Sequence, residues 1–282
     1  TSIGAGTGKL TISSATAAKG FDGQGIVNGG GNWAYTANTN VEFHNGFANN
    51  GGAFTWGTGI QIFNTNNQSL TNNFSIPNVE IDGITLTNPG TLEITGSLAE
   101  TTTGILKQGS AATLNINYPD INYPGGIIPA GITIDASTAN NTVNYIYPGA
   151  QSVIPGNYYN LSFSGGTTAT AVSGLTISGN VNTDLGTTLH AGDFTHFIGG
   201  NLTNAGTFEG GTQGGTGTIY LNGSVDQTIS NTNAAPTNHT VNVTIDKPAG
   251  SIILNTDFTV VNTLNMVKGN IILNTHNLIL GI

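Results

Sequence analysis

The stretch that decides the fold is Thr218-Ile219-Tyr220-Leu221, followed by Gln227-Thr228-Ile229 and then by Val241-Asn242-Val243-Thr244-Ile245. In each segment apolar residues alternate with small polar ones, a pattern that places one face of a short β-strand in a core and the other in water. The same order of segments occurs twice more, around Gln68 and Gln151. The three glutamines are 83 and 76 residues apart, so the chain contains three composite repeats.

Short strands separated by Gly or Asn turns fill the rest of the chain. Such strands, without helices between them, fit either a β-solenoid or an array of β-sandwiches. Sandwich strands are longer, and hairpins often carry Asn-Gly turns, which do not separate most neighbouring strands of this chain. We therefore expect one continuous, parallel β-helix-like solenoid over residues 1–282. At about 20 residues per coil it would have roughly 14 coils. The residues expected to point into its core include Ile81, Ile84, Leu86, Leu92, Ile94, Leu161, Phe163, Leu175, Ile177, Val243 and Ile245.

The composition supports an all-β fold and excludes several functions. The chain has one Met, five Lys, no Arg and no Cys, and 7% of its residues are charged. With a net charge of −9 it lacks the basic surface that a nucleic-acid partner or an anionic membrane requires. Without Cys it has no disulfide, thiolate metal ligand or thiol nucleophile. No apolar run approaches the roughly 18 residues of a membrane span, and we expect neither membrane insertion nor a cofactor.

Half of the chain, from Asn141 to Gly281, resembles the repeat regions of large secreted adhesin-like, filamentous surface proteins of Bacteroidota and related bacteria. The segments that carry the resemblance are Pro148–Val153, Tyr158–Leu161, Ile198–Phe208 and Asn277–Gly281. The resemblance implies export to the cell surface, a parent chain of many repeats and a role in attachment or filament building. It implies no enzyme activity. The chain begins at Thr1 without a charged-then-apolar leader, so we expect a removed signal peptide or a fragment of a longer chain.

Two clusters of ionisable residues are candidates for chemistry. Glu80 and Asp82 are two residues apart on an expected strand, so they share a face, as paired catalytic carboxylates of glycosidases can. His190, Asp193 and His196 could supply two imidazoles and a carboxylate to a metal, but their spacing matches no helix-borne zinc motif. We interpret both clusters as surface residues and expect no catalytic or metal site. The other histidines, His44, His239 and His276, are expected to be isolated.

Four aromatic residues form the one candidate binding site. Trp33, Tyr35, Phe54 and Trp56 could provide a platform on which sugar rings stack, although such residues are more often part of a core. The recurring glutamines are expected to have a structural role, because amide side chains on stacked coils can form hydrogen-bonded ladders.

The sequence therefore predicts a non-catalytic extracellular stalk or filament segment. Its expected partners are further solenoid repeats or copies of itself, since neither end of the chain reads as a polar or helical cap. The alternative is a carbohydrate-binding or carbohydrate-active β-helix protein that contacts surface glycans. An ice-binding solenoid ranks last, because its regular Thr-x-Thr rows are missing from this chain.

Overall fold

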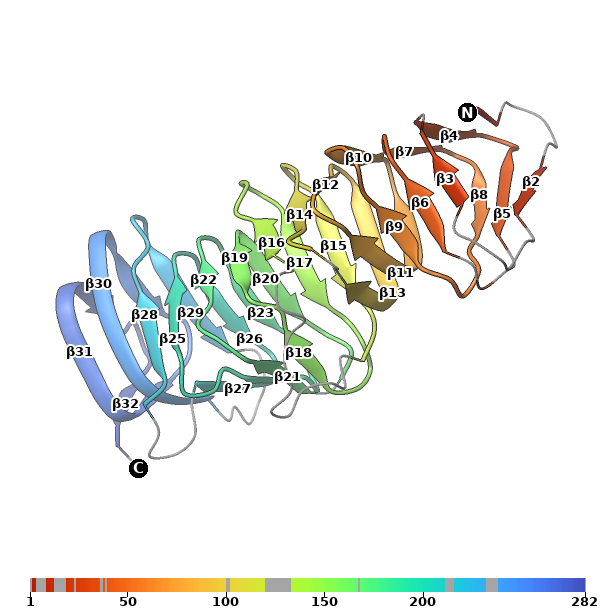
Figure 1. The fold of residues 1–282 in the computed structure, drawn as a ribbon. Helices are drawn as coiled ribbons and strands as arrows, with labels where there is room; N and C mark the ends of the chain where they lie inside the picture. The colour runs from red at the N-terminus through yellow and green to blue at the C-terminus, as the bar shows by residue number, and fades with distance from the viewer. Residues whose placement is uncertain are drawn as a thin grey trace. The chain divides into compact units, whose positions relative to one another are not determined.

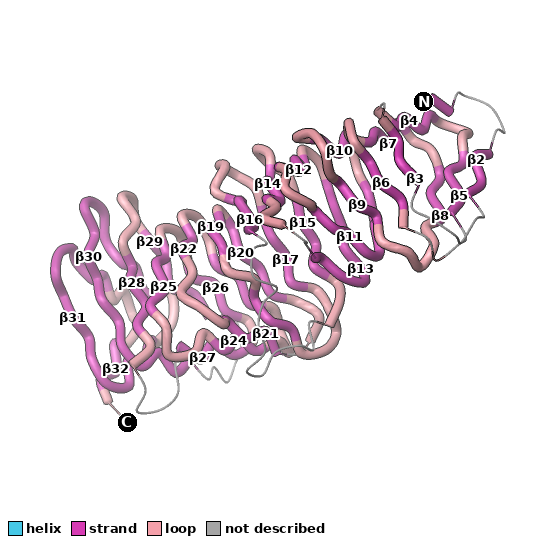
Figure 2. The backbone as a smooth tube through the Cα atoms, in the orientation of Figure 1, coloured by secondary structure: helices cyan, strands magenta, loops and turns pink. Residues whose placement is uncertain are grey.

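The computed structural model describes residues 2–3, 9–12, 19–22, 24–35, 38, 40–99, 102–119, 133–166, 168–210, 216–231 and 238–281. All regular elements in these residues are β-strands, and none of the described residues lies in a helix that could span a membrane (Figure 2). The strands pair in parallel and stack as a β-solenoid of about 11 turns. The predicted all-β solenoid is therefore confirmed.

The number of coils is smaller than the 14 expected, because the coils vary in length. Leu161 pairs with Val181, an offset of 20 residues, whereas Leu202 pairs with Ile229, an offset of 27. Part of this difference lies in the link between residues 221 and 227, which is longer than the link between residues 177 and 181. A constant coil length of about 20 residues therefore overestimates the number of turns. By its contacts the chain divides into two compact units, Thr1–Tyr118 with Asn122–Asp135, and Pro119–Ile121 with Ala136–Ile282. A single continuous solenoid over residues 1–282 stays a prediction.

The first unit stacks its strands on three faces (Figure 1). One face contains β3 (Lys19–Phe21), β6 (Val41–Phe43) and β9 (Gln61–Phe63). The second contains β1 (Ser2–Ile3), β4 (Gly25–Asn28), β7 (Phe47–Asn50), β10 (Gln68–Thr71), β12 (Thr85–Asn88), β14 (Ile105–Gln108) and β16 (Thr133–Ala136). The third contains β2 (Lys9–Ile12), β5 (Asn32–Tyr35) and β8 (Ala53–Thr55). β11 (Phe74–Ile81) pairs with β9 and with β13 (Thr91–Ala99), which in turn pairs with β15 (Thr113–Ile116).

The second unit has the same three-faced coil. The first face contains β19 (Gly156–Tyr158), β22 (Thr176–Ile177), β25 (Thr195–Ile198) and β28 (Thr218–Leu221). The second contains β17 (Thr142–Tyr145), β20 (Asn160–Phe163), β23 (Val181–Thr183), β26 (Leu202–Asn204) and β29 (Gln227–Asn231). The third contains β18 (Gln151–Val153), β21 (Thr168–Ala171), β24 (Thr188–His190) and β27 (Thr207–Gly210). The long strands β30 (Asn238–Leu254) and β31 (Phe258–Ile272) bend through all three faces, and β32 (Leu278–Leu280) pairs with β31.

The core of each unit is built from alternate residues of these short strands. In β20, for example, Leu161 and Phe163 are buried while Asn160 and Ser162 face outward. All of the residues predicted to point inward are at most 8% exposed, which confirms the predicted strand phase. Burying one such aliphatic side chain stabilises the fold by about 1.5–3 kcal/mol.

The corners of the second unit carry a ladder of asparagines. Asn160 Oδ1 accepts a hydrogen bond from the backbone N–H of Asn180 at 2.9 Å, and Asn180 Oδ1 accepts one from Asn201 at 2.8 Å. Asn201 Oδ1 continues the ladder to the backbone N–H of Thr228 at 2.8 Å. Each amide thus satisfies a backbone donor on the next coil where the strand ladder is interrupted.

Glutamine has a different role from the expected ladder. Gln227 accepts a hydrogen bond from the backbone N–H of Gly223 at 2.9 Å and donates to the carbonyl of Gly200 at 2.6 Å. Gln68 and Gln151 likewise accept hydrogen bonds from backbone N–H groups. All three are buried at the start of a strand. The expectation that they form ladders with one another is wrong, because each uses its amide to bond backbone groups of turns, on its own coil or on the preceding one.

Candidate functional site

The predicted aromatic platform is split between the core and a half-buried position. Trp33 is 3% exposed and packs against the rings of Phe21 and Phe47, with centroids 5.1 and 5.0 Å away. It is therefore a core residue and presents no ring face to a ligand. The side chain of Tyr35 lies outside the described residues.

Phe54 and Trp56 lie at the end of the sheet formed by β2, β5 and β8. Both are half-buried, and their rings stack on each other with centroids 5.5 Å apart and an interplanar angle of 18°. Phe47 and Phe74 support the Phe54 ring edge-on from inside the coil. That Phe54 and Trp56 bind a sugar ring stays a prediction.

The paired carboxylates lie at the end of β11. Glu80 and Asp82 are half-buried, and Asp82 Oδ1 accepts a hydrogen bond from the Thr102 hydroxyl at 2.6 Å. The register places Glu80 between Ile62 and Ala99 on the neighbouring strands, so no charged side chain flanks it in the ladder. The interpretation of these acids as non-catalytic stays a prediction.

The histidine–aspartate cluster does not form. His190 pairs with Glu209 on the neighbouring strand, Asp193 lies in an exposed turn, and His196 points into the core. The expectation that His196 lies on the surface is therefore wrong. The same alternation that buries Ile198 in β25 also buries the residue two positions before it. Among the described residues, no group of three His, Asp or Glu side chains is arranged to hold a metal ion.

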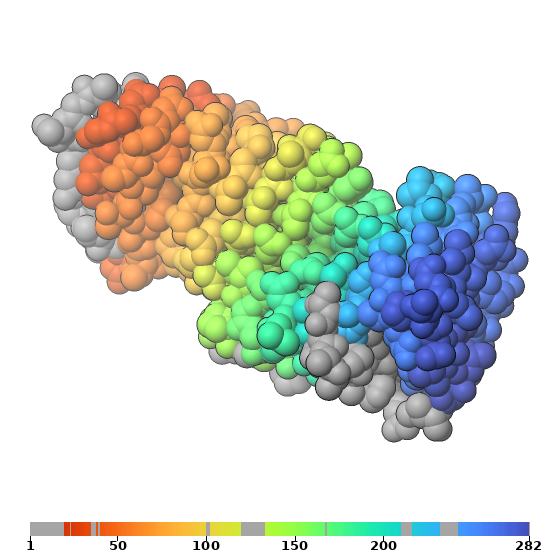
Figure 3. All heavy atoms as spheres, turned by 180° about the vertical axis from the view of Figure 1, so that it is seen from behind, coloured from red at the N-terminus to blue at the C-terminus, as the bar shows by residue number. Residues whose placement is uncertain are grey.

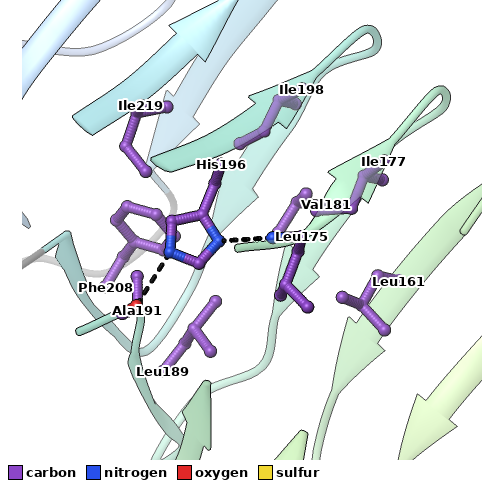
Figure 4. A pocket seen from close by; sticks show the side chains of 10 residues that line it. All are labelled: Leu161, Leu175, Ile177, Val181, Leu189, Ala191, His196, Ile198, Phe208 and Ile219. Carbon is purple, nitrogen blue, oxygen red and sulfur yellow. Dashed lines mark hydrogen bonds between the residues drawn. The ribbon is translucent and has the colours of Figure 1, made fainter. Parts of the chain in front are cut away.

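His196 lies beside a cavity of about 10 Å³ lined by aliphatic side chains and Phe208 (Figure 4). Its Nδ1 accepts a hydrogen bond from the backbone N–H of Leu175 at 3.3 Å, and its Nε2–H donates to the carbonyl of Ala191 at 2.8 Å. This pairing requires the neutral imidazole. Burial lowers the pKa of His196 below its usual value, partly opposed by the bond to Ala191. The cavity is too small and too apolar to be a ligand site.

His44, expected to be isolated, bridges two carboxylates in the first unit. Its Nδ1 lies 2.7 Å from Asp22 Oδ1, and its Nε2 lies 3.4 Å from Glu42 Oε2. The hydrogen bond to Asp22 is the main reason that the pKa of His44 is raised above its usual value, and Glu42 adds to it. His276 is also not isolated, since its Nδ1 lies 3.8 Å from Asp257. The side chain of His239 lies outside the described residues.

A hollow of about 350 Å³ opens on the outer side of β22 and β25, beside the link that follows β28. Its lining combines the ring of Phe197 with Thr176, Ser178, Asn222 and Ser224. Phe197 is 37% exposed, and the ring of Tyr220 packs beside it with centroids 4.9 Å apart. None of the residues that line this hollow was predicted from the sequence to bind a ligand. The signal that could have found it is the alternation in β25, which turns Phe197 outward whenever His196 and Ile198 face inward.

One side of the hollow is a loop of residues 222–226, which we call the wall loop. It joins β28 to β29 with five residues, whereas the links after β22 and β25 have three. In Figure 3 the chain near residues 222–226, in cyan, stands above the turquoise surface beside it. The two additional residues therefore make the wall loop project from a face that is otherwise regular.

Lys247 holds the wall loop from beneath. It is 1% exposed, and its Nζ donates to the carbonyls of Gly223 and Val225 and to Gln227 Oε1 at 2.9, 2.8 and 2.7 Å. All three ammonium donors therefore have acceptors. Burial lowers the pKa of Lys247, and the charge of Asp226 partly opposes this effect. Two of the three acceptors are carbonyls of the wall loop and the third is at the start of β29, so the buried ammonium fixes the conformation of the loop against that strand.

Comparison of the chain with protein-family models, with curated proteins and with solved structures found no significant match.

Proposed function

We propose that the chain is a non-catalytic, extracellular structural segment of a bacterial surface protein, and that it works by stacking coil on coil with further β-solenoid. The observation that supports this most is the last described coil of the second unit. The extracellular location and the role in attachment or filament building rest on the resemblance of residues 141–281 to secreted adhesin-like repeats.

The inward-facing apolar side chains of the second unit stack from coil to coil, and in this last coil the side chain at the end of the stack is exposed. Leu221 and Ile245 face inward and are each 2% exposed, and their register partner on β31, Met266, is 44% exposed. Val267 and Leu280 are 59% and 62% exposed. Large apolar side chains exposed on one coil in this way are typical of interaction surfaces.

The backbone at this coil is also available for pairing. Within the described residues, the segment 263–266 of β31 pairs with β30 alone. At the other end, β1, β2 and β3 pair only with β4, β5 and β6 among the residues that the structure describes. Strands with an unpaired edge are templates for addition of a further strand, and these edges have the parallel orientation of the solenoid. A coil of a second copy fits both the apolar column and the strand edges.

The test is the association state of this chain, measured by sedimentation velocity over a wide concentration range. We expect the wild type to associate end to end as its concentration rises, and Met266→Asp to weaken that association because it places a charge in the apolar contact. Leu185→Asp is the matched control, since Leu185 is 73% exposed in the turn before β24, away from the last coil. A wild type that stays monomeric at its highest soluble concentration, or equal association of the two variants, would contradict the proposal.

A second candidate function is carbohydrate binding, which the hollow at Phe197 favours.

A further inference from the structure

We infer that the hollow bounded by Phe197 and the wall loop is a binding site for a neutral saccharide. The inference goes beyond the proposed coil stacking and does not depend on it. It rests on the shape of the hollow, on the way the wall loop is fixed and on the chemistry of the lining.

The size of the hollow suits a small ligand. Binding pockets for small molecules have volumes of roughly 300–1,000 Å³, and this one, at about 350 Å³, is at the lower end of that range. By contrast, the cavity beside His196 has about 10 Å³, which is too small for a ligand. The outer hollow is therefore the better candidate of the two.

The wall loop is fixed before any ligand arrives. Besides the three hydrogen bonds from Lys247, the loop is held by close packing at Gly223, where an added Cβ would lie 2.0 Å from the carbonyl oxygen of Gly199. Gly250 also packs closely against the loop, since an added Cβ there would lie 2.5 Å from the Val225 carbonyl carbon. A site with a fixed wall loses little conformational entropy on binding.

The lining combines one aromatic face and the exposed side chain of Val225 with small polar groups. The Phe197 ring is partly exposed and is supported by Tyr220, so it can pack against the C–H face of a pyranose. The side chains of Thr176, Asn222 and Ser224 are exposed at the rim, where hydroxyl and amide groups can hydrogen-bond to sugar hydroxyls. An apolar patch with a few convergent polar groups is the usual composition of a small-ligand site.

The charge of the lining points to a neutral ligand. None of the residues that line the hollow carries an ionisable side chain. The nearby ammonium of Lys247 is buried and already hydrogen-bonded to three acceptors, so it is not free to bind an acidic sugar. A peptide strand is disfavoured as well, because β25 already pairs with β22 on one side and with β28 on the other, which leaves no backbone edge for it.

The experiment is isothermal titration of the chain with three neutral probes (cellotetraose, mannotetraose and xylotetraose) and with trigalacturonate as the acidic comparator. Met266→Asp serves as the background, which keeps binding separate from association between copies. Phe197→Ala tests the aromatic face, and Phe194→Ala is its matched control because both rings are 37% exposed and Phe194 does not line the hollow.

We expect at least one neutral probe to bind, with an affinity that falls about tenfold or more in Phe197→Ala and is unchanged in Phe194→Ala. The inference is overturned if no neutral probe binds, if trigalacturonate binds more tightly than the neutral probes, or if the two phenylalanine variants lose affinity equally. Circular dichroism of both variants confirms that they fold alike, which is expected because both rings are on the surface.

Discussion

At the scale of single residues, His196 links the stability of the second unit to pH. The folded imidazole is neutral because its Nδ1 accepts the Leu175 N–H, and burial lowers its pKa below the ordinary 6.5. The unfolded chain therefore binds a proton more readily than the folded chain. The stability that the neutral ring contributes is present above pH 6.5 and is lost as the pH falls through the lowered folded pKa. We expect the free energy of unfolding to fall on mild acidification more steeply in the wild type than in His196→Leu.

The control for this prediction is His44, whose shift has the opposite sign. Asp22 and Glu42 raise the pKa of His44, so the stability it contributes is present below pH 6.5 and is lost as the pH rises through its folded pKa. Urea unfolding at several pH values should therefore show a steeper acid loss in His44→Gln than in the wild type. Identical pH profiles for the wild type and His196→Leu would contradict the assignment of a neutral, buried His196.

The burial of His196 could have been predicted from the alternation of the strand, but the polar composition of residues 190–196 favoured a surface turn. Histidine, aspartate and glycine between residues 190 and 196 are typical of a polar turn. The strand phase set by Ile198 overrides that tendency, since residues two apart in a strand share a face. The burial of Lys247 could not have been predicted in this way. Its ammonium donates its hydrogen bonds to groups about 20 residues earlier, on another coil, and no local sequence pattern indicates such contacts.

At the scale of the strand, the alternation of inward and outward residues determines stability. Ile177 is 3% exposed in β22, whereas its neighbour Thr176 faces outward. Replacing Ile177 with Asp buries an unpaired charge, so Ile177→Asp should lose several kcal/mol of unfolding free energy. Thr176→Asp, one residue away on the opposite face, should change it by no more than about 0.5 kcal/mol. Thermal and urea unfolding of the two variants checks this, and equal losses would show that the strand phase is wrong.

The strands and their faces were predictable from the sequence, whereas the turns between them were not. The alternation in segments such as Leu161–Phe163 identifies the buried face directly. The length of a link does not change that alternation, so nothing in the strands signals that the wall loop is two residues longer than its neighbours. The overestimate of the coil number and the missed hollow have this same physical origin.

At the scale of the whole molecule, hydrogen-bond ladders and apolar columns replace charge pairs and cross-links. Only 7% of the residues are charged and there is no Cys, so no disulfide joins the coils and ion pairs such as His190–Glu209 are few. Asparagine corners and buried aliphatic columns take that role within each unit. This composition could be read from the sequence, but which amides face a turn and which face a neighbouring coil depends on the register of the stack.

The net charge of −9 sets the response of self-association to salt. Two copies of the chain repel each other electrostatically, while the surface proposed to join them is apolar at Met266, Val267 and Leu280. Sodium chloride shortens the range of the repulsion, to about 8 Å at physiological ionic strength, and leaves the apolar contact in place. We therefore expect end-to-end association to strengthen as sodium chloride is added, and to do so much less in Met266→Asp. Light scattering at constant protein concentration measures this, with sulfate avoided because it strengthens apolar contacts by itself. Assemblies that dissociate when salt is added would mean that ion pairs hold the copies together, and would exclude the apolar end coil as the contact.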